Sequence, residues 1–163
     1  MKRHLPLIIL ALGAVWLLAS LRERAPETEF DVNGFGRLPV LVNGRIKPMD
    51  TVARSSLLQL QGRQRVATPE GETLAPIEWL LEVQFRPEKA DALRTFEIVH
   101  PDLLTLFNLT MADGDGKKRF SYLQLEKQIP ELERQSRLAQ PLDPQARSPF
   151  QRAVVQLHAN LVL

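Results

Sequence analysis

The feature that most constrains this chain is an apolar run near its start, from Leu5 to Leu21, which contains no charged residue. Its length lies within the roughly 17–25 residues that a membrane-spanning helix needs, whereas a cleavable signal core is usually about 7–15 residues long. Residues 18–20 place a bulky leucine where signal cleavage prefers a small residue. The run therefore predicts an uncleaved transmembrane anchor within residues 1–24, with a cleaved signal or a buried soluble helix as alternatives.

Basic residues flank the apolar run on both sides, with Lys2 and Arg3 before it and Arg22 and Arg24 after it. The positive-inside count is therefore nearly balanced. The free amino terminus, and the acidic Glu23 among the later basic residues, favour an N-terminus on the cytoplasmic side. We expect a single-pass protein of the inner (cytoplasmic) membrane, with the bulk of the chain outside the cytoplasm, in the periplasm.

Composition and motifs exclude several classes of function. The net charge of +2 over 163 residues is too small to indicate a nucleic-acid surface. The chain has no cysteine, which excludes disulfides, thiolate zinc sites, cysteine nucleophiles and covalent attachment of c-type haem to this chain. His4, His100 and His158 are far apart, so no metal site is expected. No nucleophile, phosphate-loop or metalloprotease motif is present, so no catalytic residue is expected, and an enzyme is the least favoured hypothesis.

The rest of the chain predicts one small domain. The charged stretch with Pro26 has no apolar period, which indicates a linker over residues 25–36. Apolar residues at helical spacing then alternate with turn signals, which predicts a mostly helical α+β domain over 37–147. Its expected core consists of Leu57, Leu58, Ile77, Trp79, Leu80, Leu81, Phe96, Ile98, Leu104 and Leu125. The expected elements are helices over 51–61, 76–86 and 101–107, a strand over 95–99, a loop over 63–75, and a capped helix after Ser121.

A last helix is expected within residues 148–163, beginning at Pro149. Its apolar side needs a partner surface, and the sequence contains no helix stop signal before Leu163. Residues 161–163 are apolar in succession, which a single packed stripe cannot hide. We therefore expect this helix to run on into a longer chain, toward the membrane or a partner, rather than to fold back on the domain.

The pair Asn43-Gly44 lies between two apolar runs and predicts a β-hairpin over residues 38–47. Pro48 is expected to end the second strand, and the Asp50 carboxylate to cap the following helix. Arg54 lies one helical turn after Asp50, within reach of an ion pair. Turn and cap requirements explain this set, and partner docking is the alternative. The candidate structural or docking residues are Asn43, Gly44, Arg45, Lys47, Pro48, Asp50 and Arg54.

The segment from Leu38 to Leu58, and above all residues 44–54 (Gly-Arg-Ile-Lys-Pro-Met-Asp-Thr-Val-Ala-Arg), resembles the extracytoplasmic region of System II cytochrome c biogenesis proteins (CcsA/CcsB, ResB/ResC-like). Pro-Ile-Glu-Trp-Leu-Leu at 76–81, His-Pro-Asp-Leu at 100–103 and Phe-Ser-Tyr-Leu at 120–123 fit the same order. The resemblance implies a role in delivering haem across the membrane and attaching it to apocytochrome c outside. It also implies several membrane spans, a tryptophan-rich haem-handling loop and histidine ligands.

The chain differs from that family in its predicted spans, its tryptophans and its haem ligands. It has one predicted span and two tryptophans, Trp16 and Trp79, without a tryptophan-rich loop. None of the family's haem ligands can be placed on it, so haem is implied only by the resemblance. His158 on the last helix is the one haem candidate, and a solvated or interfacial histidine is the simpler interpretation.

We therefore expect a membrane-anchored component, or an N-terminal fragment, of the cytochrome c biogenesis and haem-delivery machinery that acts as a scaffold or docking domain. Its expected partners are the membrane and either other subunits of that machinery or a missing C-terminal membrane region. Apocytochrome c is a further candidate partner. The alternative is an envelope-anchored protein-interaction module that has no connection with haem.

Overall fold

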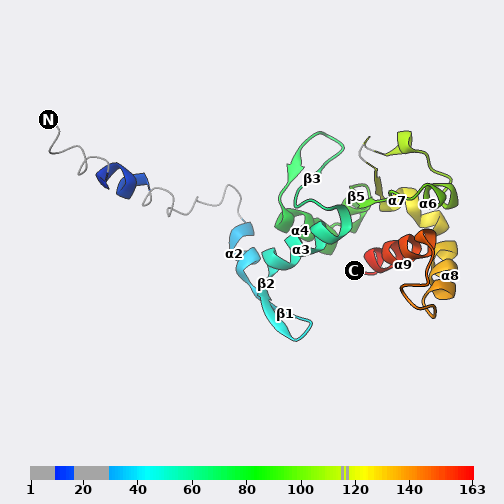
Figure 1. Ribbon diagram of the computed structural model, residues 1–163. Helices are drawn as coiled ribbons and strands as arrows, with labels where there is room; N and C mark the ends of the chain where they lie inside the picture. Colours follow the sequence, from blue (N-terminus) through cyan, green and yellow to red (C-terminus); the bar gives the residue numbers. More distant parts are fainter. Residues whose placement is uncertain (1–9, 17–29, 115, 117) are drawn as a thin grey trace. The chain divides into compact units, whose positions relative to one another are not determined.

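The computed structural model describes residues 10–16, 30–114, 116 and 118–163 (Figure 1). The chain divides into two units, Met1–Asn33 and Gly34–Leu163. In the first unit, residues 10–16 are helical. They form the middle of the predicted anchor, and its remainder lies outside the described residues. Among the residues that are described, no helix combines the length and apolar character needed to cross a membrane.

The second unit is a mixed α/β structure in which helices predominate, as the sequence predicts (Figure 1). Its strands form three antiparallel pairs, of which the sequence predicts only the hairpin around Asn43-Gly44. The pairs are β1 with β2, β3 with β4, and β5 with β6. In chain order, the elements from residue 32 onward are α2 (Val32–Arg37), β1 (Pro39–Val42), β2 (Arg45–Pro48), α3 (Met49–Gln61), β3 (Val66–Ala67), β4 (Thr73–Leu74), α4 (Pro76–Phe85), α5 (Pro87–Ala90), β5 (Arg94–Glu97), α6 (Pro101–Leu106), η1 (Met111–Asp113), β6 (Arg119–Ser121), α7 (Tyr122–Leu125), η2 (Glu126–Gln128), α8 (Ile129–Ala139) and α9 (Pro149–Leu161).

Buried apolar side chains form two clusters. The smaller one lies around α3 and α4 and consists of Leu57, Leu60, Val66, Trp79 and Leu93. The larger one joins β5, β6 and the later helices and consists of Ile98, Leu103, Leu104, Phe107, Phe120, Leu125, Leu132, Val154 and Leu157. Phe96 of β5 packs against both clusters. The β5–β6 pair therefore lies where the two halves of the core meet.

The start of α3 differs from the prediction. Pro48 occupies the N-cap position, and the Met49 N–H is hydrogen-bonded to the Leu38 carbonyl at 3.0 Å. The helix thus begins before the expected Thr51, and Asp50 lies inside its first turn, where it makes no capping hydrogen bond. The prediction that Asp50 caps the helix was wrong, because the base of the hairpin already satisfies the first helical N–H. Gly62 ends the helix as predicted, with φ 67°.

The predicted core is correct for Leu57, Ile77, Trp79, Ile98, Leu104 and Leu125, which are all buried. Leu80, Leu81 and Phe96 are half-buried. The prediction that Leu58 is buried was wrong, because Leu58 is 47% exposed. The expected loop over 63–75 contains the small β3–β4 hairpin. Strands of two residues are too short to show an alternating pattern in the sequence, so this hairpin was not predicted.

The last helix, α9, begins as predicted, with Ser148 at its N-cap accepting a hydrogen bond from the Gln151 N–H at 3.2 Å. Val154 and Leu157 are buried in the larger cluster, and α9 packs against α8 and α6. Asn160 accepts a hydrogen bond from the Gln59 side chain of α3 at 3.3 Å. The expectation that this helix would not fold back on the domain was therefore wrong.

Candidate functional site

The segment that carries the family resemblance begins with the hairpin β1–β2, which forms as predicted. Its register pairs Val42 with Arg45 across the turn, and Asn43 and Gly44 have φ of 51° and 74°. Both turn residues thus adopt the left-handed conformation that a two-residue type I′ turn needs. Asparagine and glycine tolerate this conformation better than other residues, which explains their place here.

The two faces of the hairpin differ sharply. Because side chains alternate along a strand and cross-strand partners share a face, one face consists of the pairs Pro39–Pro48 and Leu41–Ile46. All four of these residues are exposed, Leu41 to 70% and Ile46 to 77%. An apolar sheet face normally packs on a core. Here it faces away from the domain, so the hairpin presents an apolar surface with no covering element among the described residues.

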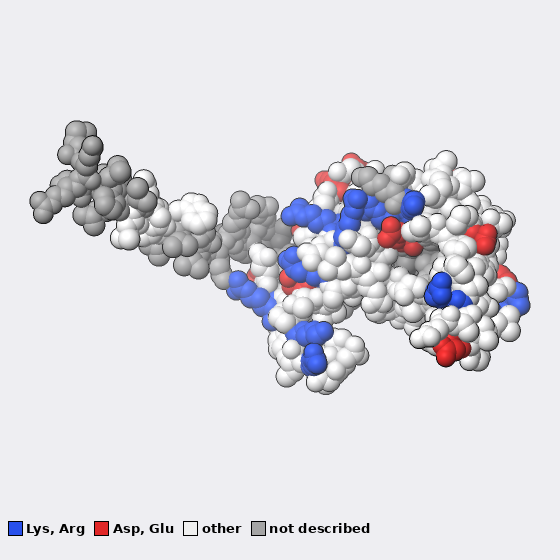
Figure 2. All heavy atoms as spheres, in the orientation of Figure 1, with Lys and Arg blue, Asp and Glu red and all other residues white. Residues whose placement is uncertain are grey.

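The other face of the hairpin carries its charge. Arg45 and Lys47 are the cross-strand partners of Val42 and Val40, and no acidic residue occurs between Arg37 and Met49. Figure 2 shows lysine and arginine atoms on the hairpin, which is otherwise uncharged in that view. The hairpin therefore combines an apolar face with a face on which two basic residues lie opposite two valines.

Asp50 and Arg54, the remaining members of the predicted set, form an ion pair on α3. The Arg54 Nε donates to Asp50 Oδ2 at 2.6 Å, and both side chains are partly exposed, at 47% and 33%. This hydrogen bond, and then the charge of Asp50, raises the pKa of Arg54. The Asp50 carboxylate also lies near the positive end of the helix dipole. These two residues stabilise the start of α3 and are not part of the hairpin surface.

The histidines do not gather into a site. His100 is the N-cap of α6, where its Nδ1 accepts a hydrogen bond from the Asp102 N–H at 3.3 Å, and its ring meets the edge of Phe150. His158 is half-buried on α9. Across the described part of the chain, no group of three metal-binding side chains lies close enough to hold an ion. The assignment of His158 to haem stays a prediction.

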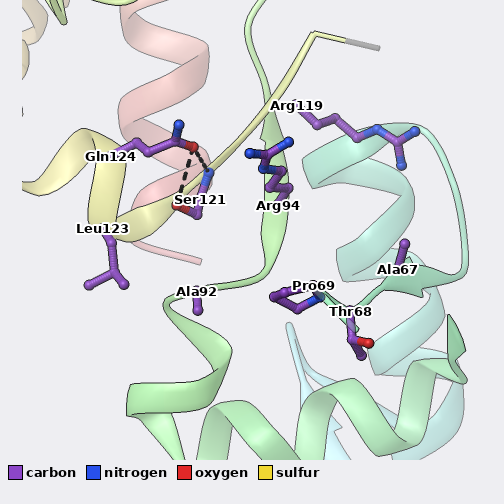
Figure 3. A pocket seen from close by; sticks show the side chains of 9 residues that line it. All are labelled: Ala67, Thr68, Pro69, Ala92, Arg94, Arg119, Ser121, Leu123 and Gln124. Carbon is purple, nitrogen blue, oxygen red and sulfur yellow. Dashed lines mark hydrogen bonds between the residues drawn. The ribbon is translucent and has the colours of Figure 1, made fainter. Parts of the chain in front are cut away.

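Sequence reasoning missed a polar pocket of about 450 Å³ beside the β5–β6 pair (Figure 3). Two arginines, Arg94 and Arg119, line it together with the polar side chains of Thr68, Ser121 and Gln124. The rest of its wall consists of alanine, proline and leucine side chains. Arg94 and Arg119 belong to strands that only tertiary pairing brings together, so no local motif could have revealed the pocket.

Two further cavities differ from this pocket in their chemistry. One shares Thr68 and Pro69 with it but is lined by four glutamates and one lysine. The other is a shallow groove beside α9, which includes Glu97 and His100. Neither of them is lined by an arginine.

No protein-family model matches the chain, and a search of curated proteins gives no significant match. The resemblance to System II cytochrome c biogenesis proteins therefore rests on the residues of the sequence itself.

Proposed function

We propose that this chain is a membrane-anchored docking component of the cytochrome c biogenesis and haem-delivery machinery, and that the hairpin β1–β2 is its docking element. The observation that carries the proposal is the exposed apolar face of Pro39, Leu41, Ile46 and Pro48. This face lies within the segment that resembles the System II proteins. The domain acts as a scaffold, and the chemistry of haem attachment belongs to its partners.

The energetics favour a covered hairpin. Burial of one leucine or isoleucine side chain contributes about 1.5–3 kcal/mol, so covering Leu41 and Ile46 would contribute several kcal/mol. A two-stranded hairpin is only marginally stable without packing on one face. Neither β1 nor β2 pairs with a third described strand, so both outer edges also offer backbone groups to a partner.

The position of the hairpin in the chain indicates where its partner lies. Only the stretch from Arg22 to Arg37 separates it from the apolar run that we propose to be a single transmembrane helix of the inner membrane. An extended chain spans at most about 3.3–3.6 Å per residue, which keeps the hairpin within roughly 60 Å of the membrane surface. We propose that its partner is the membrane-embedded part of the same machinery, and that the domain lies on the extracytoplasmic side.

The proposal is tested in cells in which each variant replaces the original chain. Replacement of Leu41 and Ile46 by serine should lower the yield of mature cytochrome c at least tenfold, while the full-length chain accumulates normally. The matched control is Leu138→Ser on α8, because Leu138 is similarly exposed, at 61%, and lies outside the hairpin. A photoreactive residue at position 41 should give a crosslink to a membrane subunit, and the same residue at position 138 should not.

Three outcomes decide between the hypotheses. Loss of maturation together with a position-specific crosslink supports docking within the haem-delivery machinery. A crosslink to a membrane protein with unchanged cytochrome c favours the alternative, an envelope interaction module without a connection to haem. Normal maturation and no crosslink would refute the hairpin as a docking element.

A further inference from the structure

The turn of the hairpin β1–β2 determines which backbone groups its outer edges expose. Val42 and Arg45 flank the two turn residues directly, so they form the hydrogen-bonded pair that closes the turn. Hydrogen-bonded and non-hydrogen-bonded pairs alternate along an antiparallel ladder, so the next pair, Leu41 with Ile46, is not hydrogen-bonded across the hairpin. The N–H and C=O groups of Leu41 and Ile46 therefore point outward, one residue on each edge.

Proline closes both edges beyond that point. Outward-pointing backbone groups recur at every second residue of a strand, and the next such position is Pro39 on β1 and Pro48 on β2. Neither residue has an N–H to donate, and proline on an edge strand hinders the addition of a further strand. An added strand could thus form paired hydrogen bonds with only one residue of either edge. Recognition of the hairpin therefore comes mainly from its side chains.

The apolar face supplies such a side-chain surface. Leu41 and Ile46 lie opposite each other, and the side chains of a non-hydrogen-bonded pair approach closely. Pro39 and Pro48 form the neighbouring pair on the same face, so the four side chains make one continuous patch without a polar group. Leu41 and Ile46 lie toward the turn end of the hairpin, which points away from the helices of the second unit (Figure 1). A patch of this kind is complementary to an apolar groove.

Arg45 adds a charge that the domain does not compensate. It is exposed and lies next to the turn, whereas Lys47 is half-buried nearer to the base of the hairpin. Among the described residues, neither side chain forms an ion pair within the domain. The nearest acidic residue along the chain, Asp50, already pairs with Arg54 at 2.6 Å. A carboxylate opposite the turn end would therefore complement Arg45.

The arrangement of the two faces indicates a protein surface rather than a bilayer. Side chains alternate along a strand, so Arg45 and Lys47 lie on the face opposite the apolar patch. A bilayer that covered the patch would leave both charges pointing away from the lipid head groups. The walls of a protein groove, in contrast, extend past both faces of a hairpin and can place a carboxylate beside Arg45.

We propose that the hairpin docks face-on into an apolar groove with an acidic rim on a membrane-embedded protein. Leu41 and Ile46 enter the groove, and Arg45 pairs with a carboxylate on its rim. This inference rests on the proposed function, because it takes the hairpin to be the docking element of the chain. It adds the mode of docking and the chemistry of the partner surface.

Photocrosslinking of the full-length chain in isolated membranes tests the mode of docking, with an apolar photoreactive residue at position 41 and second substitutions at position 46. Ile46→Ser keeps the outward N–H and removes the apolar side chain, so the crosslink to a protein should fall about fivefold or more at equal chain level. Ile46→Pro removes that N–H and keeps an apolar side chain, so the crosslink should stay within about twofold. Strand addition predicts the opposite order. Leu138→Ser on α8 is the matched control for the loss of an exposed apolar side chain.

The acidic rim is tested with the same crosslink from position 41. Arg45→Glu should lower its yield about tenfold or more, and Arg45→Lys, which keeps the charge, about threefold or less. Arg137→Glu on α8 is the matched control, because it reverses an exposed charge outside the hairpin and should leave the yield unchanged. Raising the salt from about 0.05 M to about 0.5 M should weaken the crosslink of the chain with Arg45 more than that of Arg45→Gln.

The outcomes separate this inference from the proposed function. Absence of any crosslink from position 41 without a second substitution would refute the hairpin as a docking element, and this inference with it. A protein crosslink that Ile46→Pro abolishes and Ile46→Ser keeps would show strand addition, which leaves docking intact but overturns the face-on mode. Equal effects of Arg45→Glu and Arg137→Glu would overturn the acidic rim. An adduct with phospholipid in place of a protein would show that the bilayer covers the patch, and would overturn the groove.

Discussion

Two neighbouring leucines on α3 provide a strict test of how the helix packs. Leu57 is fully buried in the smaller cluster beside Trp79, whereas Leu58 is 47% exposed. Leu57→Ala removes buried carbon atoms worth roughly 2 kcal/mol of transfer free energy and leaves a cavity, so the free energy of unfolding should fall by about 2–5 kcal/mol. Leu58→Ala loses about half of the transfer contribution and creates no closed cavity, so its cost should be about 1 kcal/mol.

Urea unfolding of the full-length chain in nonionic detergent measures both free energies. The fluorescence of Trp79, in a Trp16→Phe background, monitors the unfolding. Trp79 is 6% exposed and contacts the same cluster, so its emission should report the loss of that packing. The midpoint should shift clearly for Leu57→Ala and little for Leu58→Ala, with an unchanged slope. Equal shifts would mean that both leucines lie in the core, as the sequence pattern suggested, and would refute the orientation of α3 in which only Leu57 is buried.

Three further substitutions test electrostatic details. Asp50→Asn should lower the free energy of unfolding by less than about 1 kcal/mol, because it loses a partly exposed ion pair with Arg54 and a favourable interaction with the helix dipole but no capping hydrogen bond. A loss near 2 kcal/mol in urea unfolding would restore the capping hypothesis. Hydrogen bonds, first from Arg134, lower the pKa of Glu131 from 4.5 to about 2, so its contribution to stability is present above pH 4.5 and is lost as the pH falls toward 2. Unfolding midpoints between pH 5 and about pH 2 should therefore fall more steeply for the original chain than for Glu131→Gln, and parallel curves would contradict this. Burial, and then the charges of Glu126 and Glu88, raises the pKa of Asp91, so ionised Asp91 destabilises the fold at neutral pH. Asp91→Asn should therefore raise the melting temperature at pH 7, and this gain should shrink as the pH falls toward 3.8.

The sequence determined the elements whose signals are local. Asn43-Gly44 specifies its turn, because only a few residue types tolerate two successive left-handed conformations. Gly62 ends α3 for the same reason, and Ser148 begins α9 through a hydrogen bond to a residue three positions away. The Gln124 side chain likewise accepts a hydrogen bond from the Ser121 N–H at 2.9 Å, as the capping pattern predicts. Each of these interactions joins groups within one turn of chain, so the residue types nearly decide the structure.

The tertiary structure decided what lies inside and what lies together. Leu57 and Leu58 read alike as apolar residues of one helix, and only the position of α4 determines which of them is buried. The apolar side of α9 packs against α8 and α6. The residues of α9 alone do not show which elements will cover that side. The polar pocket is lined by two arginines because the β5–β6 ladder, with its irregular register between Arg94 and Phe96, brings Arg94 and Arg119 to one wall. Such contacts join residues far apart in the chain, and their free energy depends on the whole packing of the core rather than on any local pattern.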